Sequence, residues 1–246
     1  MQKAPSLSKR LTALFTLCSH ALADSRPYVL TDVGCDHAHV PICLLQEGIV
    51  SRAVCADILP GPLEKAKENL ARYDVPEGQV ELVLSDGLDA ISPGGEREVL
   101  LIAGMGGRAI EDILLRKPKK TMAFRELILQ PQNEAGAVRG AVEALHYRIA
   151  EEEMVEEKGK FYPMLRAVQA EEEFPAGNTL QLLYGPRLLE KKDNTLRRYL
   201  LRGKEKMTAV LNAFPEDGNA EERMELLWQL EQIRAALLII GEEETS

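Results

Sequence analysis

Short runs of β-branched and other apolar residues alternate with helix-forming stretches over residues 28–170, and this alternation constrains the fold more than any other feature. A nearly continuous apolar run indicates a strand that is covered on both faces. Such strands separated by helices are typical of βαβ units in a mostly parallel, doubly wound sheet. We therefore expect an α/β fold. Seven runs are the expected strands: Tyr28–Val33, Arg52–Asp57, Gln79–Leu84, Glu98–Ala103, Glu126–Gln130, Tyr147–Met154 and Phe161–Gln169.

Helices are expected between these strands and in front of them. The helices between strands are predicted at Val40–Glu47, Pro62–Tyr73, Arg108–Leu115 and Glu134–Leu145. An amphipathic helix should precede the first strand, since apolar residues recur at helical spacing between Leu7 and Leu22. The link between the last two strands, Glu156–Lys160, is too short for a crossover helix. Those two strands should therefore pair as an antiparallel hairpin.

The periodicity changes after Pro186. Apolar residues then recur in steps of four and three in two stretches, which a Pro-Glu-Asp-Gly-Asn breaker at residues 215–219 separates. Heptad-like stretches joined by a short turn are typical of an antiparallel coiled-coil hairpin, although two ordinary helices packed on the main domain would give a similar pattern. Asn219, with Glu222 three residues later, should begin the second helix. We expect a Rossmann-like domain at residues 1–186 and a helical coiled-coil hairpin at residues 187–246.

Composition excludes several classes of protein. Hydrophobic residues make up 45% of the chain and charged residues 28%, as in ordinary globular proteins. No apolar run approaches the roughly 18 residues that a membrane helix needs, and the first residues lack the apolar core of a secretory signal. The four cysteines form no CxxC pair, so we expect neither a zinc site nor a disulfide framework. A cytoplasmic protein without a membrane partner is expected.

Charge is unevenly distributed along the chain. The formal net charge of −9 argues against a surface that binds nucleic acid throughout. Residues 187–206, however, contain eight basic and three acidic residues, a local net charge of +5, so the remainder carries −14. A smaller basic cluster at residues 116–120 is either a solvated loop or, if RNA is the partner, an additional contact.

The carboxyl ends of the strands are where a doubly wound sheet binds its ligands. The loop after the first strand reads Asp32-Val-Gly-Cys-Asp-His37, and Gly34 lets the backbone approach a ligand closely. The loop lacks the G-x-G-x-x-G pattern that cradles a pyrophosphate. One glycine with two carboxylates suits a cationic ligand without phosphate, such as S-adenosylmethionine (SAM), better than NAD. A metal held by Cys35, His37 and His39 is disfavoured, because no fourth ligand is assigned.

Each of the next strands also ends in residues that suit SAM. Asp57 is placed to accept hydrogen bonds from both ribose hydroxyls, and Ile58 to lie on the adenine face. Asp86 follows the third strand, near the adenine edge, and the fourth strand runs into a glycine-rich segment that leaves room beside the methyl group. The expected cofactor-binding residues are Asp32, Gly34, His37, Asp57, Ile58, Asp86, Gly87, Ala103, Gly104 and Met105. Met105 could instead be a packing residue.

Six regions of the chain together resemble the bacterial tRNA (adenine-22-N1)-methyltransferases of the TrmK type. They are Leu7–Leu11, Asp32–His37, Ala56–Asp57 with Gly61–Pro62, Asp86–Leu88, Ile102–Gly107 and Leu127–Pro131. The combination of the Asp-x-Gly-x-Asp-His loop with Ile-Ala-Gly-Met-Gly-Gly is specific, because most other methyltransferases carry residues like Asp/Asn-Pro-Pro-Tyr at the latter place. The resemblance implies a SAM-dependent methyltransferase domain of Rossmann-like fold, followed by a helical hairpin that helps to hold tRNA.

Methyl transfer to adenine N1 needs no general base, because N1 carries a lone pair and no proton. The enzyme has to hold N1 in line with the S–CH₃ bond. A carboxylate at the N6 edge would stabilise the positive charge that develops on the base, and Asp36 is the expected catalytic residue. The expected substrate-binding residues are Gly106, Gly107, Gln130 and Pro131 around the base and Lys191, Lys192, Arg197 and Arg198 on tRNA. Arg10 could cover the cofactor carboxylate or touch RNA.

Other functions remain compatible with the sequence. A SAM-dependent methyltransferase that acts on another RNA site, a small molecule or a protein would keep the cofactor loops but would not need a basic hairpin. A non-enzymatic adaptor would not need carboxylates at successive strand ends, and an NAD-linked oxidoreductase would need the missing glycines. No metal is expected. A monomer is favoured, although a heptad hairpin can also pair between chains.

Overall fold

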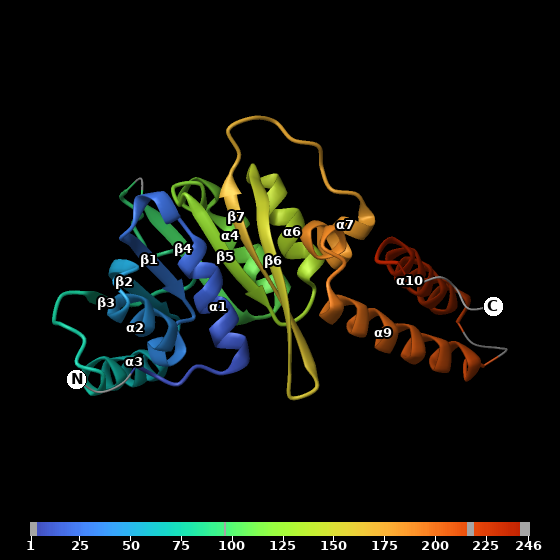
Figure 1. Ribbon diagram of the computed structural model, residues 1–246, viewed down its shortest axis with the longest axis horizontal. Helices are drawn as coiled ribbons and strands as arrows, with labels where there is room; N and C mark the ends of the chain where they lie inside the picture. Colours follow the sequence, from blue (N-terminus) through green and yellow to red (C-terminus); the bar gives the residue numbers. More distant parts are fainter. Residues whose placement is uncertain (1–3, 96, 216–218, 242–246) are drawn as a thin grey trace. The chain divides into compact units, whose positions relative to one another are not determined.

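The computed structural model describes residues 4–95, 97–215 and 219–241. The chain divides into two compact units, a sheet unit within residues 1–176 and a helical unit within residues 177–246 (Figure 1). This division lies ten residues before the boundary expected between residues 186 and 187. As a consequence, helix α7 (Thr179–Tyr184) groups with the helical unit.

The sheet unit contains a seven-stranded sheet in the order β3-β2-β1-β4-β5-β7-β6. Strands β1 to β5 are parallel, and β7 runs antiparallel to both β5 and β6. This arrangement confirms the doubly wound sheet and the terminal antiparallel hairpin that the sequence predicts. The strands are β1 (Tyr28–Val33), β2 (Val50–Asp57), β3 (Val80–Leu84), β4 (Glu98–Met105), β5 (Glu126–Pro131), β6 (Tyr147–Glu157) and β7 (Lys160–Gln169).

Helices cover both faces of this sheet, which explains why its central strands are apolar runs. The helices of the sheet unit are α1 (Lys9–His20), α2 (His39–Gln46), α3 (Pro60–Arg72), α4 (Gly107–Arg116), α5 (Pro118–Thr121) and α6 (Ala135–Ala144). Of these, only the short α5 was not expected from the sequence. In β4, Val99 and Leu101 belong to a buried cluster with residues of α1, α2 and α3, whereas Leu100 and Ile102 belong to a second cluster with residues of α4 and α6.

In its described residues, the helical unit contains α7, α8 (Pro186–Glu190), α9 (Asn194–Asn212) and α10 (Ala220–Ile239). Helices α9 and α10 pack together as the predicted hairpin. A Cβ on Gly203 would lie 3.2 Å from Ile233 Cδ1, so the glycine lets the helices approach closely there. Asn219 caps α10, as expected, by accepting hydrogen bonds from the N–H groups of Glu221 and Glu222.

Helices α7 and α8 were not predicted from the sequence. The signal for α7 was present, because Asn178 and Gln181 form a capping box in which each side chain accepts a hydrogen bond from the other residue's backbone N–H. Within the described ranges, no helix is both long and apolar enough to cross a membrane.

Candidate active site

Four neighbouring parallel strands end at one edge of the sheet unit. Strand β1 lies between β2 and β4, with Val33 opposite Ala56 of β2 and Ile102 of β4. Strand β3 continues the row, with Leu84 opposite Asp57. From β1 the chain adds β2 and β3 on one side of the sheet and then β4 and β5 on the other. Doubly wound sheets bind their ligands where the strand order reverses in this way. The fold therefore brings together the four loops that the sequence singled out.

The loop after β1 depends on a glycine for its conformation and for space. Gly34 has a φ of +78°, and a Cβ added there would lie 2.3 Å from Met105 Cε. The backbone N–H groups of Gly34 and Cys35 donate to the carbonyl of Ala56 at 2.8 and 3.2 Å, which ties the loop to β2. Met105, which the sequence left open between packing and ligand contact, packs against Gly34 and the core. Its contact with a cofactor stays a prediction.

A strained turn follows this loop. His37 and Ala38 have φ values of 68° and 52°, a left-handed conformation that costs residues with a side chain about 1–2 kcal/mol each. Asn69 of α3 holds the turn, because its Nδ2 donates to the carbonyl of His37 at 3.0 Å and lies 3.3 Å from His39 Nε2. Sequence reasoning missed Asn69. The sequence did contain a signal for it. Asn69 lies three positions after Ala66, so helical spacing places this polar side chain on the buried face of α3.

Asp36, the expected catalytic residue, lies at the start of this turn. Its side chain is 60% exposed, and its Oδ1 lies 3.5 Å from His37 Nε2. The His37 ring stacks on His39 with 5.4 Å between ring centroids. Asp36 therefore projects from the end of β1 at a position that a substrate can reach, whereas His37 is held between two neighbours.

Asp32 differs sharply from Asp36 in its surroundings. It is 6% exposed, and burial, followed by the charge of Asp57, raises its pKa to about 7. A buried carboxylate of this kind gains from a neighbouring positive charge, because a cation favours its ionised form. Titratable groups that are perturbed in this way are concentrated at ligand sites.

The end of β2 offers both polar and apolar contacts. Asp57 accepts a hydrogen bond from the N–H of Leu59 at 3.0 Å through Oδ1. Ile58, Leu59 and Leu84 are each about 60% exposed at the ends of β2 and β3, although they are large apolar residues. When a ligand buries an apolar side chain of this size completely, the burial contributes about 1.5–3 kcal/mol to the free energy of binding. An apolar ring such as adenine would supply that cover.

The loop after β3 is held by basic residues that the sequence left open as RNA contacts. Arg116 binds both carboxylate oxygens of Asp86 at 3.0 Å, and this pairing lowers the pKa of Asp86. Lys120 donates to three carbonyls of residues 88–91, and Lys117 lies 3.1 Å from Asp89. The cluster at residues 116–120 therefore stabilises this loop.

The ends of β4 and β5 form the next part of the edge. Gly104 has a φ of +78°, and a Cβ on Gly107 would lie 2.5 Å from backbone oxygens of both Asn133 and Glu134. The N–H of Gly107 donates to Asn133 Oδ1 at 2.9 Å. These glycines let the loop after β4 lie directly against the loop after β5. Gly107 is itself buried there, so its contact with a substrate stays a prediction.

Gln130 and Pro131, expected on the far wall of the base pocket, end β5. Gln130 is fully buried, and its Nε2 donates to the carbonyl of Pro131 at 2.8 Å. Its Oε1 accepts a hydrogen bond from Arg10 Nη1 at 2.8 Å. Both ends of the Gln130 side chain amide thus have protein partners.

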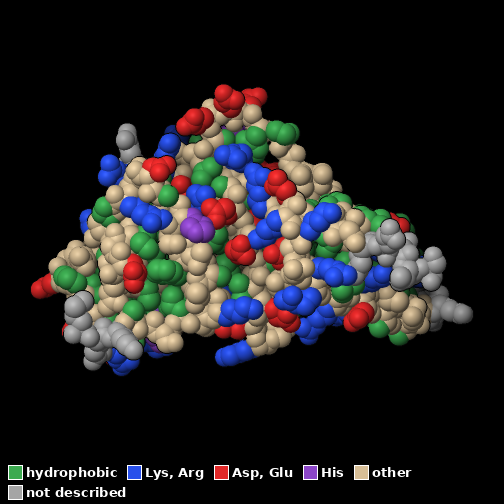
Figure 2. Space-filling view, viewed as in Figure 1, with side chains coloured by type: hydrophobic (Ala, Val, Ile, Leu, Met, Phe, Trp, Pro, Cys, Tyr) green, Lys and Arg blue, Asp and Glu red, His purple; other side chains and the backbone are tan. Residues whose placement is uncertain are grey.

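The four cations that we expect to bind tRNA lie in the helical unit. Lys191 and Lys192 follow α8, and Arg197 and Arg198 lie near the start of α9. All four are exposed, and Lys and Arg side chains are visible over α9 in Figure 2. Helix α10 differs in charge, since it carries four glutamates and two arginines.

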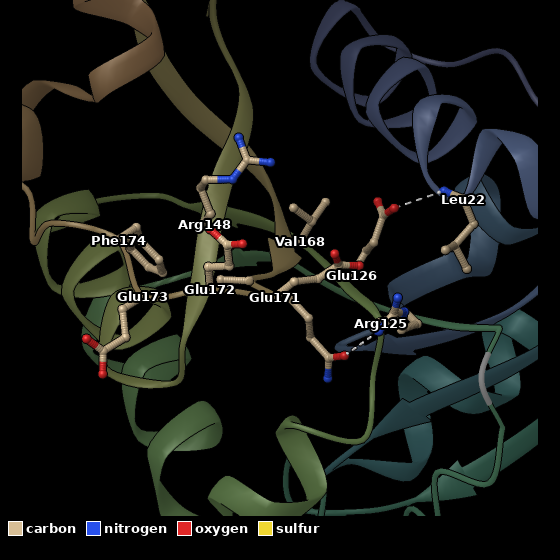
Figure 3. Close-up of a pocket in the computed structure, with 11 residues that line it drawn as sticks. Leu22, Arg125, Glu126, Arg148, Val168, Glu171, Glu172, Glu173 and Phe174 are labelled. Carbon is tan, nitrogen blue, oxygen red and sulfur yellow. Dashed lines mark hydrogen bonds between the residues drawn. The ribbon is translucent and has the colours of Figure 1, made fainter.

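A cavity of about 540 Å³ lies at the opposite edge of the sheet, where β5 begins (Figure 3). Three of its polar side chains, Arg125, Glu126 and Gln169, pair with other protein groups. Arg125 donates to Gln169 Oε1 at 3.0 Å, and Glu126 accepts from the N–H of Leu22 at 3.1 Å and from Arg166 at 2.7 Å. We assign no ligand to this cavity.

Metal ligation was a disfavoured alternative for Cys35, His37 and His39. Cys35 is only 3% exposed. Across the described residues, no group of three or more His, Cys, Asp or Glu side chains is arranged to hold a metal ion.

Comparisons with known proteins agree with this geometry. Residues 30–235 match the sequence model of the TrmK family, described as tRNA (adenine(22)-N(1))-methyltransferase. The tRNA (adenine(22)-N(1))-methyltransferase of Bacillus subtilis (strain 168) is 28% identical over 206 residues, which cover 82% of this chain and 85% of that protein.

Two solved structures are similar over nearly the whole chain. The m1A22 tRNA methyltransferase TrmK of B. subtilis has a TM-score of 0.81 at 25% identity and covers 94% of this chain and 99% of its own. Streptococcus pneumoniae Sp1610 in complex with S-adenosyl-L-methionine has a TM-score of 0.80 at 28% identity, with coverage of 94% and 100%. Because the family model matches residues 30–235, which is most of the chain, the chain belongs to the TrmK family of tRNA (adenine(22)-N(1))-methyltransferases.

Proposed function

We propose that this protein transfers the methyl group of SAM to N1 of adenine 22 in tRNA. The observation that carries the proposal is the meeting of four strand-end loops at one sheet edge, in a chain whose residues 30–235 match the TrmK family. Bound SAM supplies a methyl group that its sulfonium activates for transfer. The remaining tasks are to hold the cofactor, to orient the base and to bind tRNA.

The residues present fit SAM. Gly34 leaves room for close backbone approach, and Asp32 is a buried carboxylate that a cationic ligand would favour. Asp57 retains Oδ2 for the ribose while Oδ1 accepts from Leu59, and the exposed Ile58 suits the adenine face. His37, Asp86, Gly87, Ala103, Gly104 and Met105 complete the proposed cofactor contacts. For Asp86 we favour a contact through its backbone N–H, since Arg116 binds both its carboxylate and its backbone carbonyl.

Asp36 is the proposed catalytic residue. Its exposed carboxylate would meet the N6 edge of adenine and stabilise the positive charge that methylation leaves on the ring. No residue has to remove a proton from N1. Gly106, Gly107, Gln130 and Pro131 are proposed to shape the pocket that holds the base in line with the methyl group, and correct orientation alone can contribute roughly 7–11 kcal/mol.

The helical unit is proposed to hold tRNA through phosphate contacts of Lys191 and Lys192, which precede α9, and of Arg197 and Arg198 in α9. The target adenine is packed inside folded tRNA, so it has to be extruded at a cost of a few kcal/mol. Phosphate contacts would offset part of that cost. We further propose that the enzyme acts in the cytoplasm and that it is a monomer. Light scattering with and without tRNA would test the oligomeric state.

The direct test is to map the methylated nucleoside. Unmodified tRNA is incubated with the protein and isotopically labelled SAM, digested and analysed by mass spectrometry. We expect 1-methyladenosine at position 22 and no label in a tRNA with guanine at that position. Label at another RNA position, or only in small molecules, would favour the alternative that the enzyme is a SAM-dependent methyltransferase of different specificity.

A further inference from the structure

A guanidinium with no carboxylate partner lies at the ends of β4 and β5. Arg10, in the first turn of α1, donates from Nη1 to Gln130 Oε1 at 2.8 Å, and its guanidinium carbon lies 5.4 Å from the centre of the Tyr162 ring. A Cβ on Gly104 would lie 3.5 Å from the same Nη1. Within the described ranges, Arg10 forms no ion pair and no second hydrogen bond.

The protein holds this cation in place with neutral groups. Gln130 is fully buried, and the hydrogen bond from its Nε2 to Pro131 directs its oxygen to Arg10. The residues before Arg10 are tied to the end of β6, since Ser8 Oγ donates to the Glu157 carboxylate at 3.2 Å and Lys9 Nζ to the carbonyl of Glu156 at 3.3 Å. The position of Arg10 is therefore fixed by its surroundings.

Other arginines of the sheet unit with low exposure are neutralised. Arg139 donates to Glu152 at 2.8 Å, and Arg166 binds Glu126 at 2.7 Å as well as Glu151. Arg10 is half-buried but has only an amide oxygen and an aromatic face. A guanidinium offers five N–H donors, of which one is used here. The remaining donors suit an acceptor that carries negative charge.

We propose that Arg10 is an oxyanion-binding residue of this active site, an inference that rests on the proposed function. Its ligand is not the reacting edge of adenine, since methylation makes the ring cationic and a guanidinium aimed there would oppose the reaction. The reacting complex contains two kinds of oxyanion, the carboxylate of the cofactor's methionyl group and the phosphates of the target nucleotide. Arginine matches both through its planar fork of donors.

The test compares R10M with wild type and with R52M as a matched control. Arg52 is an exposed arginine at the amino end of β2, paired with Glu81. Calorimetry measures the affinity for SAM and for decarboxylated SAM, and filter binding measures the affinity for tRNA at several salt concentrations. Thermal unfolding verifies that each variant is folded.

If the cofactor carboxylate is the ligand, R10M should weaken SAM binding about 10- to 100-fold, the usual effect of a hydrogen bond to a charged group. Binding of decarboxylated SAM should then be unchanged. If phosphate is the ligand, SAM affinity stays the same, tRNA affinity falls, and the salt slope decreases by about one. R52M should match wild type in both assays.

The proposal is overturned if R10M binds SAM and tRNA within twofold of wild type, or if it loses SAM and decarboxylated SAM equally. These outcomes are separate from the fate of the proposed function, which the mapping of methylated wild-type tRNA decides. A wild type that methylates A22 while R10M binds both ligands normally refutes only the role of Arg10. Methylation elsewhere by wild type refutes the function, while the SAM titrations still report on Arg10.

Discussion

The carboxylates of Asp32 and Asp36 lie four positions apart in the sequence but differ in solvent exposure. Asp32 is buried in β1, whereas Asp36 projects beyond the end of that strand. Burial raises the pKa of Asp32 to about 7, whereas 60% of the Asp36 side chain is exposed. A carboxylate that is costly to ionise suits a cationic ligand, and an exposed one suits a substrate that arrives later. Burial thus separates their proposed roles.

Asp32 should make the stability of the ligand-free protein depend on pH. Its pKa is raised from 3.8 to about 7 by folding, so its ionisation destabilises the fold progressively as pH rises between these values. Each pKa unit corresponds to about 1.4 kcal/mol. We expect D32N to be more stable than wild type at pH 8 by a few kcal/mol and by less at pH 5, in urea unfolding. A difference that does not change with pH would contradict this.

The same residue should couple cofactor binding to proton release. A cation beside Asp32 lowers its pKa, so SAM should bind more weakly at pH 6 than at pH 8 and should displace a fraction of a proton at pH 7. The number of protons released is obtained by calorimetry in two buffers of different ionisation enthalpy. In D32N the release should disappear. Equal proton release by wild type and D32N would rule Asp32 out as its source.

Asp36 should affect catalysis rather than cofactor binding. We expect D36A to lower the rate of tRNA methylation by about 100-fold or more, because it removes the charge that stabilises the cationic base. SAM affinity, measured by calorimetry, should stay within a few-fold of wild type. E68A, which removes an exposed carboxylate on α3, is the control and should keep full activity. A near wild-type rate for D36A would make Asp36 a structural residue.

At the scale of elements, the hairpin of α9 and α10 separates charge between its two helices. The basic residues lie in α9 and just before it, whereas α10 carries more acidic than basic residues. The basic side of such a hairpin attracts a polyanion, whereas the acidic side repels it. This asymmetry also accounts for a protein with net charge −9 that we propose to bind tRNA.

Reversing the charge of the four proposed phosphate-binding residues should abolish tRNA binding. With Lys191, Lys192, Arg197 and Arg198 changed to Glu, we expect no measurable tRNA affinity and unchanged SAM affinity. Wild-type affinity for tRNA should fall linearly with the logarithm of salt concentration, because counterions are released on binding. Changing Arg223 and Arg234 of α10 to Glu is the control and should have a small effect. Unchanged affinity in the fourfold variant would leave the hairpin a structural or dimerising role.

At the scale of the whole molecule, the proposed tasks fall in different compact units. The strand-end loops all lie in the sheet unit, and the four proposed phosphate-binding cations all lie in the helical unit. A fragment that ends at Ala176 should therefore bind SAM with the affinity of the full chain and lose most tRNA affinity, as measured by calorimetry and filter binding. A folded fragment with impaired SAM binding would show that the helical unit contributes to the cofactor site. Circular dichroism verifies folding.

The strands of the sheet and their mostly parallel arrangement could be predicted because both follow from local patterns, whereas the order β3-β2-β1-β4-β5-β7-β6 was not predicted. An apolar run such as Val99–Ile102 is buried on both faces, and parallel strands joined by helices all end at one edge. Helix α7 was missed because its six residues are too few to show a helical period. Its capping box was the only local signal that we identify for it.

The sequence by itself determined the α/β architecture, the helical hairpin and the row of loops at the strand ends, because residues close in the chain specify each of them. Only the tertiary structure decided which of these residues pair with one another. Arg116 binds Asp86, Asn69 holds His37 and Arg10 contacts Gln130 across 30, 32 and 120 positions of the chain, respectively. Such contacts depend on how separate elements pack, and no local pattern records that packing.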